Sequence, residues 1–441
     1  MEIVGVLGLF LAIGFMIGAA YKGYHVIPVT IIASLIAIIT NNVGIWFGLS
    51  DAYATDMKNF VGNYLIMFFL GALLGQILSR SGAARMVGVT LAKKFGAKNA
   101  LLITVLTSSI LAYGGVSVFV IVFAIYPIAL YLFQEADIPR RLIPGAVMLG
   151  AGSYVMTAMP GSPALTNVIP TTYLGTTVTA APVIGIITSI VMFVSGFYLY
   201  SLYVKRVKAK GEHFVAGVND NIAELSAEEE AKLPSFASSI IPLAVTVGII
   251  LAERFLNIGL PAVFTVIIGL FAGIVVGYIL HRNRILDFKD TLHTSGTGSV
   301  NALMNTAAVV GLGGAVKAAP AFQALVTFAL NINLPVLFTT AIAVNIIAGI
   351  TGSSSAGITI FMSTFAEPFL ERGIHPEVLH RVAAISAGVL DSLPHAGPNV
   401  TFLSVAGLKF KEGYPGIFLA ICIVPFIGLV TALIVASLGL I

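Results

Sequence analysis

The sequence predicts an all-α polytopic membrane protein with two inverted-topology repeats, each containing a re-entrant helical hairpin and a broken transmembrane helix. Of its 441 residues, 58% are hydrophobic and only 10% are charged, and the mean hydropathy is +1.01. Soluble domains carry about 25% charged residues. Long runs without Asp, Glu, Lys or Arg alternate with short basic loops, and segments interrupted by glycine and proline occur at matching places in the two halves. Such breaks are typical of transporters built from repeats.

Composition excludes several other classes of protein. The formal charge of +4 would suit a nucleic-acid partner, but the basic residues lie in short loops between apolar runs, where they act as topology signals. Cys422 is the only cysteine, so an intramolecular disulfide and a cysteine-based zinc site are excluded. We therefore expect no nucleic-acid partner, no metal site and no cofactor other than a coupling ion. The apolar run 3–21 lacks a basic n-region and a cleavage site, and we expect it to stay in the membrane.

Seven runs are long enough for clear membrane crossings, since one crossing takes roughly 20 apolar residues. They are about 3–21, 25–47, 60–79, 236–252, 259–280, 293–316 and 415–440. Three other runs, 99–134, 142–204 and 318–366, are too long for one helix and have glycine-rich or proline-rich interruptions. Because cytoplasmic loops are enriched in Lys and Arg, the distribution of the 23 basic residues places both termini on the outer side. Arg381 is among the few basic residues predicted outside.

The chain divides at its single long polar segment. Residues 1–206 form the first predicted repeat and residues 236–441 the second, joined by a cytoplasmic linker at 207–235. The linker is expected to be a solvated connector with a short amphipathic helix around 224–232. Within the repeats, the hairpins are predicted at about 99–134 and 336–370, and the broken helices at about 142–175 and 379–408.

Matching motifs support the repeat. ADIPRRL followed by MPGSPALTN in the first half corresponds to GIHPEVL followed by LPHAGPNVT in the second. Pro139 aligns with Pro376, and Pro160 with Pro394. An odd number of crossings in the first half, with the hairpin counted as none, starts the second half on the opposite face of the membrane. Chance similarity between two apolar sequences remains the alternative.

Two titratable residues stand out in the second break. Asp391 is predicted at membrane depth, where a carboxylate costs at least about 2.5 kcal/mol, and His395 follows four residues later, on the same face if the helix reaches that far. We expect this pair to couple proton movement. The alternatives are an aspartate that caps a helix end and a histidine satisfied in the core. The aligned first-half residues, Thr157 and Gly161, cannot titrate.

Small hydrogen-bonding residues surround both breaks and both hairpin tips. Together with the exposed N–H groups of half-helix N-termini, they can bind a carboxylate without a buried Lys or Arg, although a single Ser or Thr often bonds its own helix backbone. The predicted substrate-binding residues are Gly115, Ser117, Ser162, Thr166, Asn167, Ser353, Ser354, Ser355, His395, Asn399 and Thr401. Thr297, Asn301 and Asn305 form a further polar face, which we expect to pack against another helix.

The segments GGVSVF, TGSSSAG, MPGSPALTN and DSLPHAG resemble the gluconate permease (GntP) family of bacterial proton symporters, within the ion transporter superfamily. The resemblance covers essentially the whole chain. It implies a homodimeric permease of the bacterial inner membrane that imports a small carboxylate with protons. The SLPH-x-G form is more similar to the short-chain branch, such as 3-hydroxybutyrate or butyrate permeases, than to the gluconate branch. Ala396 stands where branch members often have asparagine.

Two other functions remain open at this point. The Ser, Asn and Thr oxygens at the tips and breaks would also suit a sodium-coupled carboxylate transporter. The other alternative is an enzyme rather than a transporter: a hydrolase within the membrane, with Ser392 or a tip serine as nucleophile and His395 as base. The twofold occurrence of breaks and tips favours a transporter.

Overall fold

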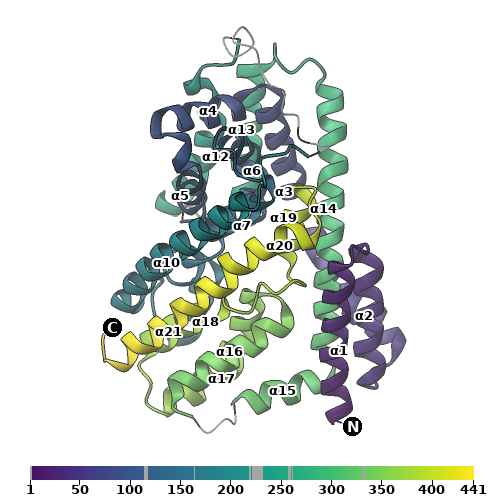
Figure 1. Ribbon diagram of the computed structural model, residues 1–441. Coiled ribbons are helices and arrows are strands. Elements are labelled where there is room, and N and C mark those ends of the chain that lie inside the picture. The colour runs from purple at the N-terminus through teal and green to yellow at the C-terminus, as the bar shows by residue number, and fades with distance from the viewer. Residues whose placement is uncertain are drawn as a thin grey trace.

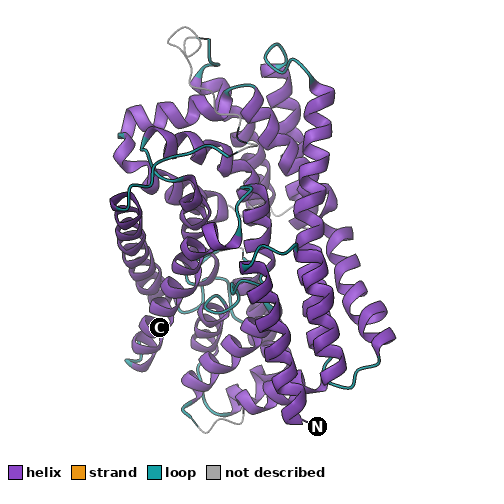
Figure 2. Cartoon of the chain, turned by 45° about the vertical axis from the view of Figure 1, so that its right-hand side comes forward, coloured by secondary structure: helices purple, strands orange, loops and turns teal. Residues whose placement is uncertain are grey.

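The computed structural model describes residues 2–113, 118–162, 164–217, 220, 232–256, 260, 262–330 and 334–441. All regular structure in these ranges is helical, which confirms the prediction of an all-α polytopic membrane protein (Figure 2). Seven of the described helices are long and apolar enough to cross a membrane, or up to eight spans if the bent pair Ala83–Phe95 and Ala97–Tyr113 counts as one.

The helices of the first half end at the start of the linker. They are α1 (Glu2–Tyr21), α2 (Val26–Thr40), the π-helical turn η1 (Phe47–Tyr53), α3 (Ala54–Arg80), α4 (Ala83–Phe95), η2 (Ala97–Asn99), α5 (Ala100–Tyr113), α6 (Val118–Glu135), η3 (Arg140–Leu142), α7 (Ile143–Ala151), α8 (Tyr154–Thr157), α9 (Leu165–Leu174) and α10 (Pro182–Ala209).

The helices of the second half follow a similar order of lengths. They are α12 (Phe236–Leu256), α13 (Ala262–His281), α14 (Phe288–Lys317), α15 (Pro320–Leu330), α16 (Val336–Thr351), α17 (Ser354–Glu371), α18 (Pro376–Ala387), α19 (Gly397–Val405), α20 (Phe410–Phe418), the π-helical turn η4 (Leu419–Ile423) and α21 (Val424–Ser437).

The long helices α3 and α14 pack against each other and join the two halves. Contacts around them are reciprocal: α2 packs on α14 and α13 packs on α3. In Figure 1 the α1–α2 pair lies beside the lower part of α14, whereas α12 and α13 lie near the top. The same kind of helix pair therefore supports opposite ends of the central α3–α14 pair. This is the arrangement expected of inverted repeats, and their exact twofold relation stays a prediction.

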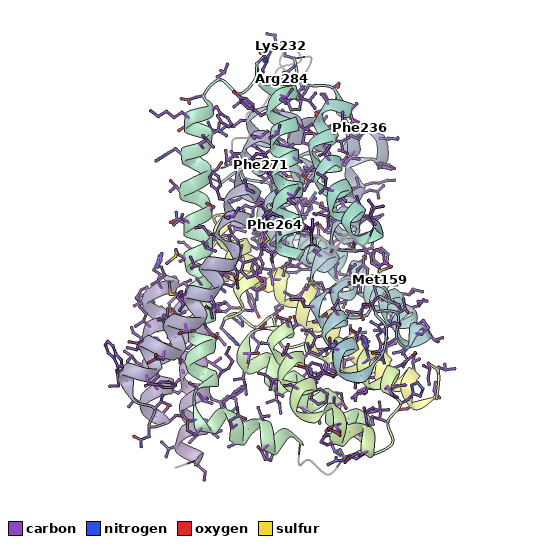
Figure 3. All side chains as sticks on the ribbon, turned by 180° about the vertical axis from the view of Figure 1, so that it is seen from behind. Met159, Lys232, Phe236, Phe264, Phe271 and Arg284 are labelled. Carbon is purple, nitrogen blue, oxygen red and sulfur yellow. The ribbon has the colours of Figure 1, made fainter. Side chains whose placement is uncertain are left out.

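The outer surface carries large apolar side chains, as a chain surrounded by lipid requires. Phe264 and Phe271 on α13 are 51% and 60% exposed (Figure 3). Figure 3 also places Lys232 and Arg284 together at the top, where Arg284 donates a hydrogen bond to the Lys232 carbonyl. Both termini lie in the lower half of Figure 1, away from this end of the linker.

Helices α5 and α6 pack against each other, as do α16 and α17, on either side of the two predicted hairpin tips. Helix α5 has 14 residues and α16 has 16, or about 21 and 24 Å at 1.5 Å per residue, both shorter than the roughly 30 Å hydrocarbon core. Helix α6 is long and apolar enough to span it, so re-entry of the first hairpin stays a prediction. The turn of the second hairpin forms at Gly352, with φ of +60°, and Ser353 caps α17 by accepting a hydrogen bond from the backbone N–H of Ala356. The first turn, 114–117, lies outside the described residues.

Both broken helices are interrupted around a proline. Between α8 and α9 the chain is non-helical around Pro160, and between α18 and α19 it is non-helical around Pro394. The two interrupted helices touch: a Cβ atom built on Gly388 would lie 2.4 Å from Cγ2 of Thr157. Only glycine allows this close approach.

The start of the linker is largely solvent-exposed, in line with the expected connector, and is also held on the protein by hydrogen bonds. Arg141 donates two hydrogen bonds of 2.7 Å to Glu212, and this guanidinium lowers the pKa of the Glu212 carboxyl. The backbone N–H of Phe214 donates to Asp137 and is the main cause of that carboxyl's lowered pKa. Most of the short helix expected at 224–232 lies outside the described residues.

A buried carboxylate anchors the linker further along. The Asp220 side chain is 7% exposed and pairs with Arg140 at 3.2 Å. Tyr126 donates a hydrogen bond to the same carboxylate. Arg140 also donates to the carbonyl of Ala406, at the end of α19. The linker is thus tied to the second broken helix through one guanidinium.

Candidate functional site

The second break runs along the tip of the second hairpin. A Cβ atom built on Gly349 would lie 3.1 Å from Cβ of Leu390, and one built on Gly352 would lie 2.9 Å from Cδ2 of His395. Glycine at both positions lets the two backbones approach this closely. Because α18 ends at Ala387, the spacing of Asp391 and His395 does not place them on one helical face, as the sequence had suggested. Each of the two residues instead lies against the hairpin tip, Asp391 beside Ser354 and His395 beside Gly352.

Asp391 lies at the N-terminus of α17. Its carboxylate accepts a hydrogen bond of 2.8 Å from Ser392 Oγ, and the hydroxyl and backbone N–H of Ser354 lie against it. The side chain is partly exposed, whereas Ser392 is buried. Behind it, the carbonyl of Ser392 accepts hydrogen bonds from Tyr414 at 3.1 Å and from the thiol of Cys422 at 3.7 Å. These contacts hold the break against α20 and η4.

His395 is 3% exposed. Its ring lies against the carbonyls of Gly349 and Ile350, yet neither ring nitrogen makes a hydrogen bond of ordinary geometry to a described residue. Asn399 donates through Nδ2 to the carbonyls of Ser392 and Leu393, but its Oδ1 likewise has no partner among the described residues. Buried polar atoms are nearly always hydrogen-bonded, so these three atoms are free to bond a polar ligand.

The first break differs from the second because every hydrogen-bonding position of its asparagine, Asn167, is bonded to the protein. Asn167 Nδ2 donates to the carbonyls of Ser162 at 2.8 Å and Val178 at 2.7 Å. Asn167 Oδ1 accepts from His380 Nε2 at 3.0 Å and from Arg381 Nη1 at 2.9 Å. All four hydrogen-bonding positions of this amide are thus occupied by the protein, which makes Asn167 a structural residue in this conformation.

Arg381 is fully buried, so a guanidinium not counted among the predicted site residues lies close to the breaks. Its Nε and Nη2 donate to the carbonyl of Ala180 and its Nη2 also to that of Val178. The neighbouring His380 accepts or donates at Nδ1 with Thr176 Oγ1 at 2.7 Å. Helix α18 of the second half therefore holds the loop that follows α9 of the first half.

The sequence contained a signal for this pair. Pro376 starts a helix, so residues four and five positions later fall in its second turn rather than in the loop before it. Counting basic residues as loop markers concealed that position.

The remaining predicted substrate-binding residues lie in the first break, in α19 and at the hairpin tips. Ser162 is buried and its Oγ accepts from the backbone N–H of Ala164, while Thr166 donates across the break to the carbonyl of Met156 at 2.5 Å. Thr401 bonds Thr306 of α14 at 2.5 Å. Ser353 and Ser355 bond each other at 3.2 Å at the second hairpin tip. Gly115 and Ser117 lie outside the described residues.

The polar face of α14 packs only at one end. Asn305 donates to Ser404 of α19 at 3.3 Å. Thr297 and Asn301 are exposed and line a shallow hollow of about 440 Å³ on α14. The expected helix–helix packing is therefore wrong for these two residues. Within the described ranges, no group of three or more His, Cys, Asp or Glu side chains could hold a metal ion.

The membrane-spanning helices, paired breaks and polar groups at the breaks define a polytopic membrane transporter. The sequence model of the GntP family permeases matches residues 4–436. The chain belongs to the GntP permease family, and the earlier resemblance is confirmed. A transporter family also rules out the hydrolase alternative.

Two relatives share much of this sequence. The uncharacterized transporter YxjC of Bacillus subtilis is 33% identical over 447 aligned residues, covering 93% of this chain and 94% of the relative. An uncharacterized transporter of Haemophilus influenzae is 26% identical, covering 75% of this chain and 74% of the relative. Both are described as transporters, in agreement with the family.

Two solved structures resemble the chain loosely. The Alcanivorax borkumensis YdaH transporter has a TM-score of 0.43 and 13% identity, covering 98% of both chains. Neisseria gonorrhoeae MtrF, described as one of a class of antimetabolite efflux pumps, has a TM-score of 0.41 and 14% identity, covering 95% of both chains.

Proposed function

We propose that this permease imports a small organic carboxylate together with protons, and that Asp391 and His395 couple the two movements. One observation carries the proposal. The protein's buried imidazole without hydrogen-bonded ring nitrogens lies in the same break as a partly exposed carboxylate, directly beside a hairpin tip. An imidazole exchanges protons near neutral pH, and a carboxylate at membrane depth is costly unless it is used.

The cargo is proposed to bind at the second break and the second hairpin tip, between Ser353, Ser354, Ser355, His395 and Asn399. Hydroxyl groups and the N–H groups at the start of α17 are suited to a carboxylate. Gluconate and a short-chain hydroxy acid such as 3-hydroxybutyrate are the two candidate cargoes. The protein is proposed to act as a homodimer in the bacterial inner membrane, with both termini outside.

The test is uptake into proteoliposomes containing the purified protein. Labelled gluconate, 3-hydroxybutyrate, butyrate and lactate are supplied outside, with an acidic exterior and no sodium. We expect accumulation of at least one carboxylate, which collapses when a protonophore removes the pH gradient. Full dependence on sodium, with uptake unchanged at zero pH gradient, would overturn proton coupling.

Variants assign the proton carrier. His395→Ala should abolish accumulation against a gradient, whereas Ser162→Ala or Thr166→Ala in the first break should keep it, since each loses only one hydrogen bond within the protein, on the order of 1 kcal/mol. If His395→Ala still accumulates cargo while Asp391→Asn does not, the carboxylate carries the proton and the imidazole shapes the break. Normal accumulation by both variants would contradict the site assignment.

Sodium coupling is the second candidate, and one observation favours it. The free Oδ1 of Asn399 is an oxygen acceptor in the same break as the Asp391 carboxylate, and oxygen atoms are the ligands that hard cations prefer. Asn399→Leu should then abolish uptake that is driven by an inward sodium gradient, measured at the same pH inside and outside. Under proton coupling, the same variant should retain the protonophore-sensitive component.

A further inference from the structure

The N-terminus of α17 already has an anion bound to it, and this anion is part of the protein. Helix α17 is 18 residues long, so its first turn carries unpaired N–H groups and a partial positive charge. Ser353 Oγ uses the N–H of Ala356, and the N–H and hydroxyl of Ser354 face Asp391. The best anion position at the second hairpin tip is therefore taken by a carboxylate of the break itself.

A second group points to the same place. His395 is 97% buried, and its Nε2 lies 3.1 Å from the position that a Cβ atom on Gly352 would occupy, immediately before the first turn of α17. Neither of its ring nitrogens has a hydrogen-bond partner among the described residues. The hairpin tip thus combines a helix N-terminus, a resident carboxylate and an imidazole with free hydrogen-bonding capacity.

We infer that the cargo carboxylate binds at the N-terminus of α17 by displacing the Asp391 carboxylate, which takes up one proton as it leaves. This inference rests on the proposed function and deepens it, because it names the subsite for the cargo carboxylate and the origin of coupling. Two carboxylates cannot share one helix N-terminus in a dry site without strong repulsion. The charge balance is simple: one anion enters the site, one proton neutralises Asp391, and the net charge of the site is unchanged.

The groups around Asp391 leave it as the natural proton acceptor. Among the described residues, the titratable groups that interact with it are Tyr414 on α20 and Cys422 in η4, and His395 lies in the same break, beside Gly352. The phenol and the thiol both point to the Ser392 carbonyl. The cations of α18 are engaged elsewhere, since Arg381 binds Asn167 and the loop carbonyls. No described ion pair holds Asp391 in place, so displacement breaks only hydrogen bonds.

Binding measured against pH tests the inference. The ligand is 3-hydroxybutyrate, or whichever carboxylate of the uptake panel the wild type accumulates, and binding to the purified protein is followed by calorimetry between pH 6 and 8. These carboxylic acids stay ionised over this range. In the wild type, the affinity for the cargo should fall by up to tenfold for each unit by which the pH rises, because binding takes up one proton. In Asp391→Asn, affinity should be independent of pH and at least as high as in the wild type at pH 8.

Transport and a control variant complete the test. Asp391→Asn should still exchange labelled for unlabelled cargo, but should not accumulate it with a pH gradient. Ser354→Ala keeps the backbone N–H and should weaken binding a few-fold while the pH slope remains. The inference is overturned if Asp391→Asn keeps the pH slope, or if the folded variant no longer binds the cargo.

A measurement on the wild type alone keeps the inference testable if the variant does not fold. Cargo binding in weakly buffered solution with a pH indicator should remove one proton from solution per cargo bound, and no proton uptake would refute displacement. The proposed function fails separately, if the wild type accumulates none of the panel in a pH gradient. If coupling holds but the pH slope disappears only in His395→Ala, the proposed function stands and the displacement of Asp391 is wrong.

Discussion

Asn167 and Asn399 follow the two breaks at similar places, yet their hydrogen bonding predicts different consequences of mutation. We compare Asn167→Leu with Asn399→Leu, because leucine has a similar size and no hydrogen-bonding group. Asn167 makes four hydrogen bonds, one of them from a guanidinium. Asn399 makes two, both to backbone carbonyls. The first variant should therefore be much less stable than the second.

The magnitude follows from the bonds lost. A neutral hydrogen bond contributes about 1 kcal/mol and one to a charged group about 1.5–3 kcal/mol, whereas bonds between membrane helices average about 0.6 kcal/mol. Loss of the four Asn167 bonds should thus cost between about 2 and 5 kcal/mol. Loss of the two Asn399 bonds should cost about 1–2 kcal/mol. Asn167→Leu also leaves the Arg381 guanidinium with an unpaired N–H in a fully buried position.

The assay is the thermal midpoint of each purified variant in detergent, followed by size-exclusion chromatography after heating. Tryptophan fluorescence is a poor monitor, since the single tryptophan, Trp46, is 80% exposed. Uptake is measured in parallel. We expect Asn167→Leu to have the lower midpoint, and Asn399→Leu to lose more uptake per folded molecule. If Asn167→Leu is as stable as the wild type and only raises the KM for uptake, it binds cargo directly and the structural role is wrong.

Three further predictions concern the linker and α14. Glu212→Gln should lower stability by less than about 1 kcal/mol, because the pair with Arg141 is partly exposed. Since the pKa of Glu212 is lowered in the folded protein, the difference in thermal midpoint should be fully present above the unfolded pKa of about 4.3 and should be lost as pH falls through the lower folded pKa. A difference that grows in acid would contradict this sign. Asp220→Asn should speed trypsin cleavage of the linker, since breaking a buried ion pair costs about 3–5 kcal/mol, and an unchanged cleavage rate would argue against anchoring. Asn301→Cys should react with a membrane-impermeant thiol reagent added from the linker side, because Asn301 is exposed. The native Cys422 is buried and should give a low background. Reaction only with a lipid-soluble reagent would place this face of α14 in lipid.

The positions of the breaks could be predicted because they depend on local chemistry. Pro160 and Pro394 lie within the non-helical breaks, where no helical N–H is required, and runs without charge mark membrane helices without reference to tertiary contacts. The glycine at the second hairpin tip, Gly352, adopts a positive φ that its residue type favours. These are properties of a few neighbouring residues, which the sequence displays directly.

The contacts that distinguish the two breaks depend on residues far apart in the chain. His380 and Arg381 reach Asn167 across more than 200 residues, and no local pattern indicates such a partner. Counting charges assigns Arg381 a side of the membrane but says nothing of its burial, since a guanidinium surrounded by carbonyl oxygens can be buried. Asp391 and His395 were correctly singled out as unusual, but their four-residue spacing implied a helical face that the end of α18 at Ala387 removes.

These contacts give the two breaks different physical characters, although their sequences match. In the first break, the amide of Asn167 and the carbonyls of Val178 and Ala180 are all bonded to the protein. In the second, His395 and Asn399 keep polar atoms that bond no described residue. A ligand gains little from polar atoms that already have partners, because it must first break those bonds. It gains more from atoms that are desolvated and unpaired. Under the proposed mechanism, the first break would therefore act as a rigid support, and the second would supply the groups that change partner and charge.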